Sequence, residues 1–272
     1  MTRISPTHPR YESLQVRARL GEAADRGVVV PEGLIAHGRG EMFDYLLGER
    51  TTPSARRAER MAARWLASAL HPVVSVNGNV AALAAKGVAR LARAHPRLAV
   101  EVNLFHRTPG RAEKIARLLR DAGVRQVLGV RPTARIAGLP SDRAWVDAKG
   151  IALADVCLVP LEDGDRAEAL RARGIRVISI DLNPLSRTSE MADLPIVDEL
   201  RRALAGIAKE IERISSAPTG RFPAFDARSS LRQAISSMQE NLARRGRRAR
   251  PRSARPSRPP ARGTGRRTRR TP

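Results

Sequence analysis

Residues 177–188 read VISIDLNPLSRT, and this stretch says most about how the chain folds. Its first four residues are rich in β-branched types, which is typical of a buried strand. The strand ends abruptly at Asp181, and Asn183, Ser186 and Arg187 follow. In an open parallel sheet, ligands bind beyond the carboxyl ends of the strands. An acid there can bind ribose hydroxyls, and an arginine can bind phosphate. The same residues are also typical of a turn in which Asp and Ser cap backbone amides, so this stretch alone leaves both interpretations open.

Helix-like and strand-like segments alternate through the rest of the chain. Thr52-Pro53 and Thr108-Pro109 each place a capping hydroxyl before a proline, the usual start of a helix. The alternation predicts an α/β fold, a doubly wound and mainly parallel Rossmann-like sheet flanked by helices. Strands or short apolar pieces are expected at residues 28–30, 34–36, 73–76, 98–102, 127–130, 156–159 and 175–180. Helices are expected at about residues 9–27, 53–70, 80–94, 109–122, 165–173, 198–214 and 225–242, with a long loop at 131–152.

The charge is unevenly distributed and separates a domain from a tail. Thirteen arginines and no acid lie between Asn241 and Pro272, so more than half of the net charge of +23 is found there. We expect one ligand-binding Rossmann-like domain at residues 1–242, whose C-terminal helical part begins near residue 198. A disordered basic tail is expected at residues 243–272. No aromatic residue interrupts these arginines, so any contact of the tail with nucleic acid would be non-specific.

Composition excludes several classes of protein. Cys157 is the only cysteine, which excludes an intrachain disulfide and a cysteine-based zinc site. No apolar run approaches the roughly 18 residues of a membrane helix. The first residues lack the apolar core of a signal peptide. We therefore expect a cytoplasmic protein without membrane contact.

Polar residues gather after the predicted strands. They form five groups, at residues 37–41, 77–79, 103–108, 160–166 and 181–188. Each group has an ordinary structural explanation: Asn77-Gly78 suits a hairpin turn, His37 a structural hydrogen bond, and the acids of the fourth group a helix cap. Because the carboxyl ends of parallel strands share one edge, five such groups predict a common ligand-binding crevice.

Familiar nucleotide-binding and metal-binding motifs are absent. No P-loop pattern occurs, and Gly38-Arg39-Gly40 continues to Phe43, where a dinucleotide fingerprint needs glycine. No His/Cys/Asp set has metal-ligand spacing, so we expect no protein metal site. Lysines number only four, so anionic ligands must be bound by arginines or by backbone amides at helix starts.

Several of these segments closely resemble those of one family. They are residues 5–11, 33–46, 74–81, 160–166 and 180–187. In order and spacing they resemble the archaeal-type phosphopantothenate synthetases, or 4-phosphopantoate–β-alanine ligases. The resemblance spans about residues 5–215, and the arginine tail lies outside it.

The resemblance implies an ATP-dependent ligase of coenzyme A biosynthesis. It would join 4-phosphopantoate to β-alanine through an acyl-adenylate, releasing 4′-phosphopantothenate, AMP and diphosphate, with Mg²⁺ accompanying ATP. By similarity, the ATP-binding residues are Arg17, Arg39, Asp181, Leu182, Asn183, Arg187, Thr188, Glu199 and Leu200. Two positions depart from the family pattern: Glu199 stands where the family usually has Asn, and Thr188 replaces Ser. The family also implies a homodimer, for which the Met61-Trp65-Ala69 helix face and the N-terminal helix are candidate interfaces.

The chemistry of such a ligase suggests roles for particular residues. A carboxylate that attacks ATP needs positive charge where negative charge develops, which makes Arg39 a catalytic candidate. The base that deprotonates β-alanine is His37, Glu162, Asp163 or Asp165, and the sequence does not choose among them. Asn77, Gly78 and Asn79, with the helix start behind them, are candidates for binding the substrate phosphate, and Asp163 and Asp165 for other substrate contacts.

Two other classes of function remain as alternatives. One is a non-catalytic nucleotide-binding regulator that keeps the fold without turnover. The other is a nucleic-acid-associated protein that acts through the basic tail.

Overall fold

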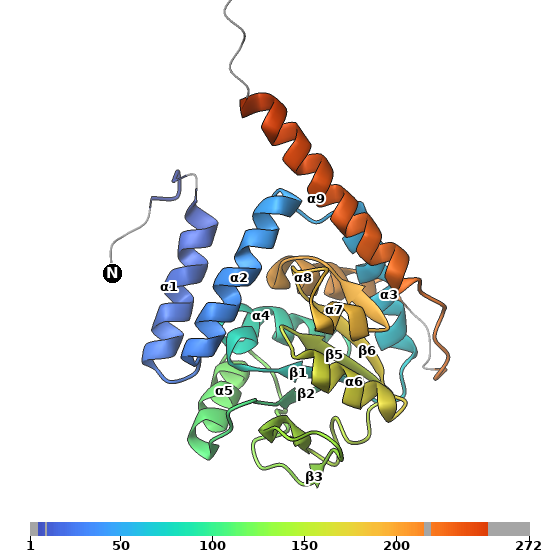
Figure 1. Ribbon diagram of the computed structural model, residues 1–272. Coiled ribbons are helices and arrows are strands. Elements are labelled where there is room, and N and C mark those ends of the chain that lie inside the picture. Colours follow the sequence, from blue (N-terminus) through green and yellow to red (C-terminus); the bar gives the residue numbers. More distant parts are fainter. Residues whose placement is uncertain (1–4, 9, 215–218, 250–272) are drawn as a thin grey trace, which may run out of the picture.

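The central element is a five-stranded parallel sheet with the strand order β2-β1-β5-β6-β7 (Figure 1). The computed structural model describes residues 5–8, 10–214 and 219–249. All four neighbouring pairs of strands run parallel, in registers such as Val74↔Val100 and Leu158↔Ile178. The strands are β1 (Pro72–Val76), β2 (Ala99–Val102), β5 (Val156–Pro160), β6 (Arg176–Ile180) and β7 (Leu194–Ile196). The predicted parallel α/β sheet is confirmed.

Helices cover both faces of this sheet. The helices are α1 (Tyr11–Asp25), α2 (Pro31–Leu47), α3 (Pro53–Ser68), α4 (Gly78–Ala94), α5 (Pro109–Asp121), α6 (Gly164–Ala172), α7 (Arg187–Met191), α8 (Leu200–Ile211) and α9 (Ala227–Ala249). Alternate residues of each strand point to opposite faces. Val74 and Val76 therefore pack in the larger core with α3, α4, α5 and α8, whereas Val73 packs in the smaller core with α6.

The predicted helix starts are confirmed where a cap precedes proline. The Thr52 hydroxyl accepts a hydrogen bond from the Ala55 amide, and the Thr108 hydroxyl accepts one from Arg111.

The excursion at residues 131–152 contains a short antiparallel pair, β3 (Ala134–Arg135) with β4 (Trp145–Val146), and a 3-10 turn, Asp142–Ala144. Ile136 and Val146 seal it against the smaller core.

Two predicted strands are wrong. Residues 34–36 lie inside α2, because Pro31 begins a helix there rather than a turn. Leu34 and Ile35 are consequently exposed at the helix surface, by 37% and 64%. Of residues 127–130, only Leu128 pairs with the sheet, through an isolated bridge to Glu101. Gly129 then turns away with φ of +75°, in the left-handed region that favours glycine.

Two parts of the chain extend from the compact body: the hairpin of α1 and α2, and the far end of α9 (Figure 1). Helix α9 continues to Ala249, so residues 243–249 belong to it and the predicted tail boundary at 243 is too early. The remaining predicted tail, residues 250–272, lies outside the described residues.

The predicted interface face of α3 is occupied within the chain, since Trp65 and Ala69 are buried in the larger core. Among the described helices, none combines the length and the apolar character needed to cross a membrane.

Candidate functional site

Polar side chains from neighbouring strands meet at the carboxyl edge of the sheet. The chain runs from β1 outward to β2 and then returns to β5 on the other side of β1, so the topological switch point lies between β1 and β5. Asn77 stands there. Its Oδ1 accepts a hydrogen bond from the Val80 amide at 3.0 Å and so caps α4, while its Nδ2 donates to the Leu161 carbonyl at 2.9 Å. The predicted Asn77 position thus lies where open α/β sheets bind ligands.

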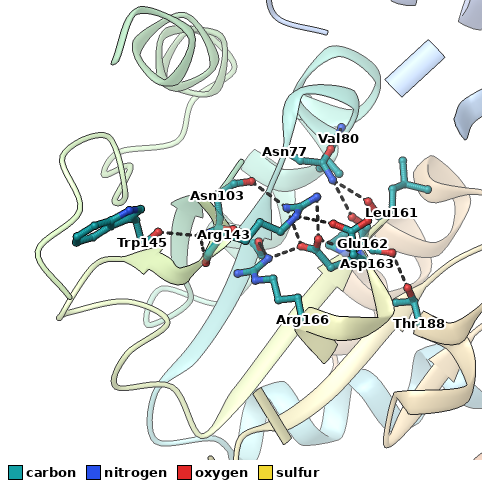
Figure 2. A network of polar contacts seen from close by, with 12 residues as sticks. Asn77, Val80, Asn103, Arg143, Trp145, Leu161, Glu162, Asp163, Arg166 and Thr188 are labelled. Atoms are coloured by element: carbon teal, nitrogen blue, oxygen red, sulfur yellow. Dashed lines mark hydrogen bonds and ion pairs between the residues drawn. The ribbon is translucent and has the colours of Figure 1, made fainter. Parts of the chain in front are cut away.

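A buried ion network lies directly beside Asn77 (Figure 2). The Glu162 carboxylate, whose side chain is 1% exposed, bonds Arg143 Nη2 at 2.8 Å and also bonds Arg166 Nη1. Arg166 is fully buried and donates to the Ser75 hydroxyl at 2.8 Å. Arg143 also bonds Asp163 at 2.8 Å. Buried charges need such pairing, so this network fixes the direction in which Glu162 points.

The backbone at Leu161 turns Glu162 into this network. Leu161 has φ of +52°, the left-handed region that a bulky residue rarely adopts and that costs on the order of 1–3 kcal/mol. Hydrogen bonds hold it there: its amide donates to the Ile180 carbonyl at 3.0 Å and its carbonyl accepts from Asn77. Stored strain of this kind is characteristic of functional sites.

The turn after β6 is the second predicted feature of this edge. The Asp181 carboxylate accepts hydrogen bonds from the Asn183 amide at 2.9 Å and from the Ser186 hydroxyl at 2.6 Å. Burial raises the pKa of Asp181, and the nearby positive charge of Arg39 opposes that rise. Thr188 donates to the Glu162 carbonyl at 2.5 Å and so joins this turn to the β5 end. The predicted capping of this turn is found, and the turn lies at the carboxyl edge of the sheet.

Arg187, which begins α7, has partners on α6. Its guanidinium bonds Asp165 at 2.5 Å and Glu168 at 2.6 Å, and its side chain is 58% exposed. Asp165 is exposed as well. These three side chains form a surface cluster at the rim of the site.

A further group of predicted residues lies on the hairpin of α1 and α2. Arg17 pairs with Glu41 at 3.0 Å. His37 lies one turn before Glu41, and its buried Nε2 has no hydrogen-bond partner in the described chain. Burial lowers the pKa of His37, although the charges of Glu41 and Glu199 act in the opposite direction. This lowered pKa favours the neutral form of the imidazole.

The start of α8 holds Glu199, one of the two positions that depart from the pattern of the family that the sequence resembles. Glu199 caps α8 by accepting the amides of Arg201 at 3.1 Å and Arg202 at 3.2 Å, and it pairs with the Arg201 guanidinium at 3.0 Å. Leu200 behind it is buried. The carboxylate thus has a structural role as a cap, which an Asn side chain also fills.

Several of the predicted residues are joined by hydrogen bonds at the sheet edge, and one residue of the buried ion network was missed. Asn79 donates to the Gly33 carbonyl at 2.8 Å and so connects the β1 end to α2. Arg143 was not predicted, whereas Asn103 and Arg166 lie in the predicted polar groups at residues 103–108 and 160–166 but were given no role there. Arg143 lies in a stretch without periodicity, whereas the four-residue spacing of Glu162 and Arg166 was a readable signal for an ion pair at the start of a helix. The principal hollows found lie elsewhere: one of about 330 Å³ between α3 and α9, and one of about 680 Å³ between the end of α1 and α5.

Comparison with known proteins gives one consistent result. A family model described as phosphopantothenate/pantothenate synthetase matches residues 54–241. A protein of Methanospirillum hungatei JF-1 is 56% identical over 206 residues, which cover 76% of this chain and 84% of the relative. A protein of Methanosarcina mazei is 49% identical over 246 residues, 89% of this chain and 96% of the relative. One of Thermococcus kodakarensis is 50% identical over 220 residues, 79% of this chain and 84% of the relative. All three are named 4-phosphopantoate–β-alanine ligase.

Proposed function

The chain belongs to the phosphopantothenate/pantothenate synthetase family, and we propose that it joins 4-phosphopantoate to β-alanine at the expense of ATP. The products are 4′-phosphopantothenate, AMP and diphosphate, in a step of coenzyme A biosynthesis. The observation that supports this in the chain itself is the junction of Asn77, Glu162 and Thr188 at the carboxyl edge of β1, β5 and β6. A reaction between two anions needs polar groups that are held in fixed positions, as they are at this edge of the sheet.

In this proposal ATP lies over the turn after β6. Asp181 is half-buried, so its carboxylate gains from hydroxyl donors such as those of a ribose. Arg39 is exposed, and its positive charge is near enough to Asp181 to oppose the rise in the pKa of that carboxyl. A phosphate attached to a ribose at Asp181 would therefore lie near Arg39. The other proposed ATP contacts are Arg17, Leu182, Asn183, Arg187, Thr188, Glu199 and Leu200. Arg187 must exchange Asp165 and Glu168 for phosphate, because both acids already bind its guanidinium.

Mg²⁺ is proposed to accompany ATP rather than to occupy a protein cage. Within the described residues, no group of three or more His, Cys, Asp or Glu side chains is placed to hold a metal ion. Mg²⁺ often binds through substrate phosphates with one or two carboxylates, and this mode suits the site. When bound, it neutralises part of the phosphate charge.

Among the four candidate bases, the contacts favour His37. Both carboxylate oxygens of Glu162 bond arginines. Asp163 is paired with Arg143, and Asp165 with Arg187. A carboxylate held by guanidinium is a poor proton acceptor. The lowered pKa of His37 favours its neutral form, and its buried Nε2 has no hydrogen-bond partner in the described chain, so we propose that it takes the proton from the β-alanine amine.

The experiment that tests the activity is AMP release from ATP, measured with both substrates and with each omitted in turn. The ligase predicts release only when 4-phosphopantoate and ATP are both present, with 4′-phosphopantothenate formed when β-alanine is added. ATP binding without AMP release under every condition would instead identify a nucleotide-binding regulator. Activity that requires RNA or DNA would favour the nucleic-acid alternative.

A homodimer and a cytoplasmic location complete the proposal. The dimer is proposed from the family resemblance, and the exposed Leu34, Ile35 and Met42 of α2 are among the apolar side chains available for it. Light scattering that gives a mass near 30 kDa across micromolar concentrations, with activity intact, would contradict the dimer.

A further inference from the structure

The outer face of α3 carries a row of arginines that the proposed reaction does not use. Arg57, Arg60 and Arg64 are exposed and follow one another at helical spacing, so they lie on one side of the helix. A helix rises about 1.5 Å per residue, so the row extends over about 10 Å. Within the described residues none of the three forms an ion pair. The guanidinium of Arg57 donates to Gln233 Oε1, a neutral amide oxygen.

The same three arginines line the hollow of about 330 Å³ between α3 and the start of α9. On the α9 side the lining is polar, with Ser229, Ser230 and Gln233. The one acid in the lining is Asp226, whose carboxylate accepts the Ser229 amide at 2.8 Å. Glu59, the only acid of α3, is buried rather than exposed beside the arginines. Three guanidinium groups therefore face one carboxylate, and the hollow is positively charged.

Helix α9 continues this positive surface away from the compact body (Figure 1). The whole helix contains one acid, Glu240. Its exposed arginines are Arg228, Arg232, Arg244, Arg245 and Arg247. After Ala249 the sequence adds nine more arginines and no acid. The charge excess of the chain is thus concentrated on α3, on α9 and in the sequence that follows, and none of these arginines is proposed to bind ATP or a substrate.

The side chains of this surface favour phosphates over other anionic partners. Guanidinium groups bind phosphate through paired donors. A protein partner or a membrane surface would in addition need apolar side chains to cover or to insert. Of the large apolar side chains exposed in the described part of the chain, only Leu242 lies on α3 or α9.

The lack of aromatic residues selects the form of the nucleic acid. None occurs in α9 or in residues 250–272, so bases cannot stack on aromatic rings there, as they do in proteins that bind single strands. In a duplex the bases face inward and the phosphates carry roughly one charge per 1.7 Å of axis. A duplex therefore presents what this surface can bind and hides what it cannot.

We propose that α3 and α9 together form a surface that binds double-stranded nucleic acid through its phosphates, irrespective of base sequence. Arg57, Arg60 and Arg64 each neutralise a phosphate, and the arginines of α9 contact the backbone further along. This function is separate from the proposed ligase reaction, because it uses no residue proposed for ATP or for the substrates.

The test measures the fluorescence anisotropy of a labelled DNA duplex of about 24 base pairs, titrated with the full chain at several salt concentrations. In the triple variant Arg57→Gln, Arg60→Gln, Arg64→Gln we expect Kd at about 100 mM salt to rise about 10²-fold. The slope of log Kd against log salt should fall by about 2–3, since each phosphate contact contributes about 0.9. The corresponding triple lysine variant keeps the charge and should keep most of the slope.

A matched control removes the same charge from another part of the surface. Arg117→Gln, Arg120→Gln and Arg125→Gln lie on α5 and just after it, where all three are exposed and Arg120 pairs with the exposed Glu113. This variant should keep the wild-type slope. Circular dichroism should show that all variants are folded, and AMP release should stay within about two-fold of the wild type, since surface substitutions of this kind leave the fold intact.

Several outcomes would overturn the proposal. One is a wild type that does not bind the duplex at about 100 mM salt. Another is a slope that falls no more in the α3 variant than in the control, because binding would then not involve this surface. A third is equal affinity for a single strand with the same number of phosphates or for vesicles of phosphatidylserine and phosphatidylcholine. A more than tenfold difference between two duplexes of unrelated sequence would contradict recognition through phosphates alone.

Discussion

Two regions supply the proposed reacting groups, and they are built in opposite ways. At the sheet edge, the end of β5 buries its charges: Glu162 is 1% exposed and Arg166 is fully buried, and every neighbouring strand end contacts this network. On the hairpin of α1 and α2, Arg39 is exposed and Arg17 is 48% exposed. Side chains locked by packing and hydrogen bonds are preorganised, whereas exposed ones can adjust to a ligand. We infer that the buried side chains of the sheet edge hold the substrates in a fixed geometry. The exposed arginines of the hairpin bind the negative charge that develops during the reaction.

The same difference predicts how each region responds to substitution. At the sheet edge, removal of one side chain leaves a buried charge unpaired, so stability and activity fall together. On the hairpin, removal of an exposed side chain leaves the fold intact and changes the rate alone. Substitutions in the two regions therefore test the comparison directly.

The largest effect is expected from Arg143→Met. Loss of the guanidinium leaves Glu162 with one cationic partner and Asp163 with none, which should cost about 3–5 kcal/mol of stability. Because Glu162 and Asp163 would no longer be held in position, kcat/KM for AMP release should also fall about 10³-fold. Urea unfolding and initial rates, corrected for the folded fraction, measure both. If the variant is as stable as the surface control Arg120→Gln, the edge is not the preorganised part of the molecule.

The sheet edge was largely predictable from the sequence, for a physical reason. β-Branched runs followed by Asp181 or by Asn77 mark strand ends, and parallel strands place their carboxyl ends together. Arg143 was not predictable, because it lies in an excursion whose few apolar residues show no period and whose contacts reach across about 20 to 40 positions of the chain. The left-handed conformation of Leu161 also leaves no trace in sequence, since the long-range bonds to Asn77 and Ile180 impose it.

The hairpin shows the opposite outcome. Arg17 and Arg39 were identified by resemblance, and the helix α1 was predicted, whereas the structure of α2 was predicted incorrectly. Leu34 and Ile35 were interpreted as a strand because apolar residues usually indicate burial, but both are exposed on α2. The helix forms because Pro31 begins it and Gly48, with φ of +83°, ends it. Gly38 and Gly40 are helical residues, so Arg39 between them lies on α2.

The next largest effect is expected on the hairpin, from Arg39→Lys. We expect kcat to fall about 10²-fold, because lysine offers a point charge where a guanidinium offers two parallel donors. The thermal midpoint should not change, since Arg39 is exposed. Initial rates and a thermal melt measure the two quantities, with the exposed Arg19→Lys of the same hairpin as the control. Wild-type turnover in Arg39→Lys would show that the hairpin does not reach the reacting atoms.

A smaller and pH-dependent effect is expected from His37→Gln. Burial lowers the pKa of His37, so the wild type gains the neutral, proton-accepting imidazole as pH rises through that lowered value. We expect the ratio of wild-type to variant kcat/KM for β-alanine to increase between pH 5 and 7 and to reach about 10-fold above that range. Rates across this range measure it. A ratio that does not change with pH would show that His37 is not the base.

The hairpin and the sheet body are joined by a buried set of charges under the start of α8. Arg202 bonds Asp44, near the end of α2, at 2.5 Å and Asp198, before α8, at 2.8 Å. The Asp198 carboxylate also accepts the Thr51 hydroxyl at 2.7 Å. Glu59 of α3 is buried beside it, with an Oε1 that has no partner in the described chain. This junction determines how firmly the adjustable region is held against the fixed one.

The smallest effect, on stability alone, is expected from Glu59→Gln at this junction. Burial and the charge of Asp198 raise the pKa of Glu59 to about 8, from an ordinary value of 4.5 in the unfolded chain. Between those pH values the folded protein holds a proton that the unfolded chain has released, so the stability of the wild type falls as pH rises through this window. Glutamine is neutral at every pH and avoids this loss.

We expect the variant to melt about 2–4 °C above the wild type at pH 8.5 and at the same temperature at pH 5. Activity at pH 7 should stay within about two-fold, because Glu59 has no proposed contact with a substrate. Thermal melts across pH, with the exposed Glu240→Gln as control, decide the matter. A difference in melting temperature that is constant with pH would mean that Glu59 is ionised in the folded protein and that the junction is held by charge pairing rather than by a retained proton.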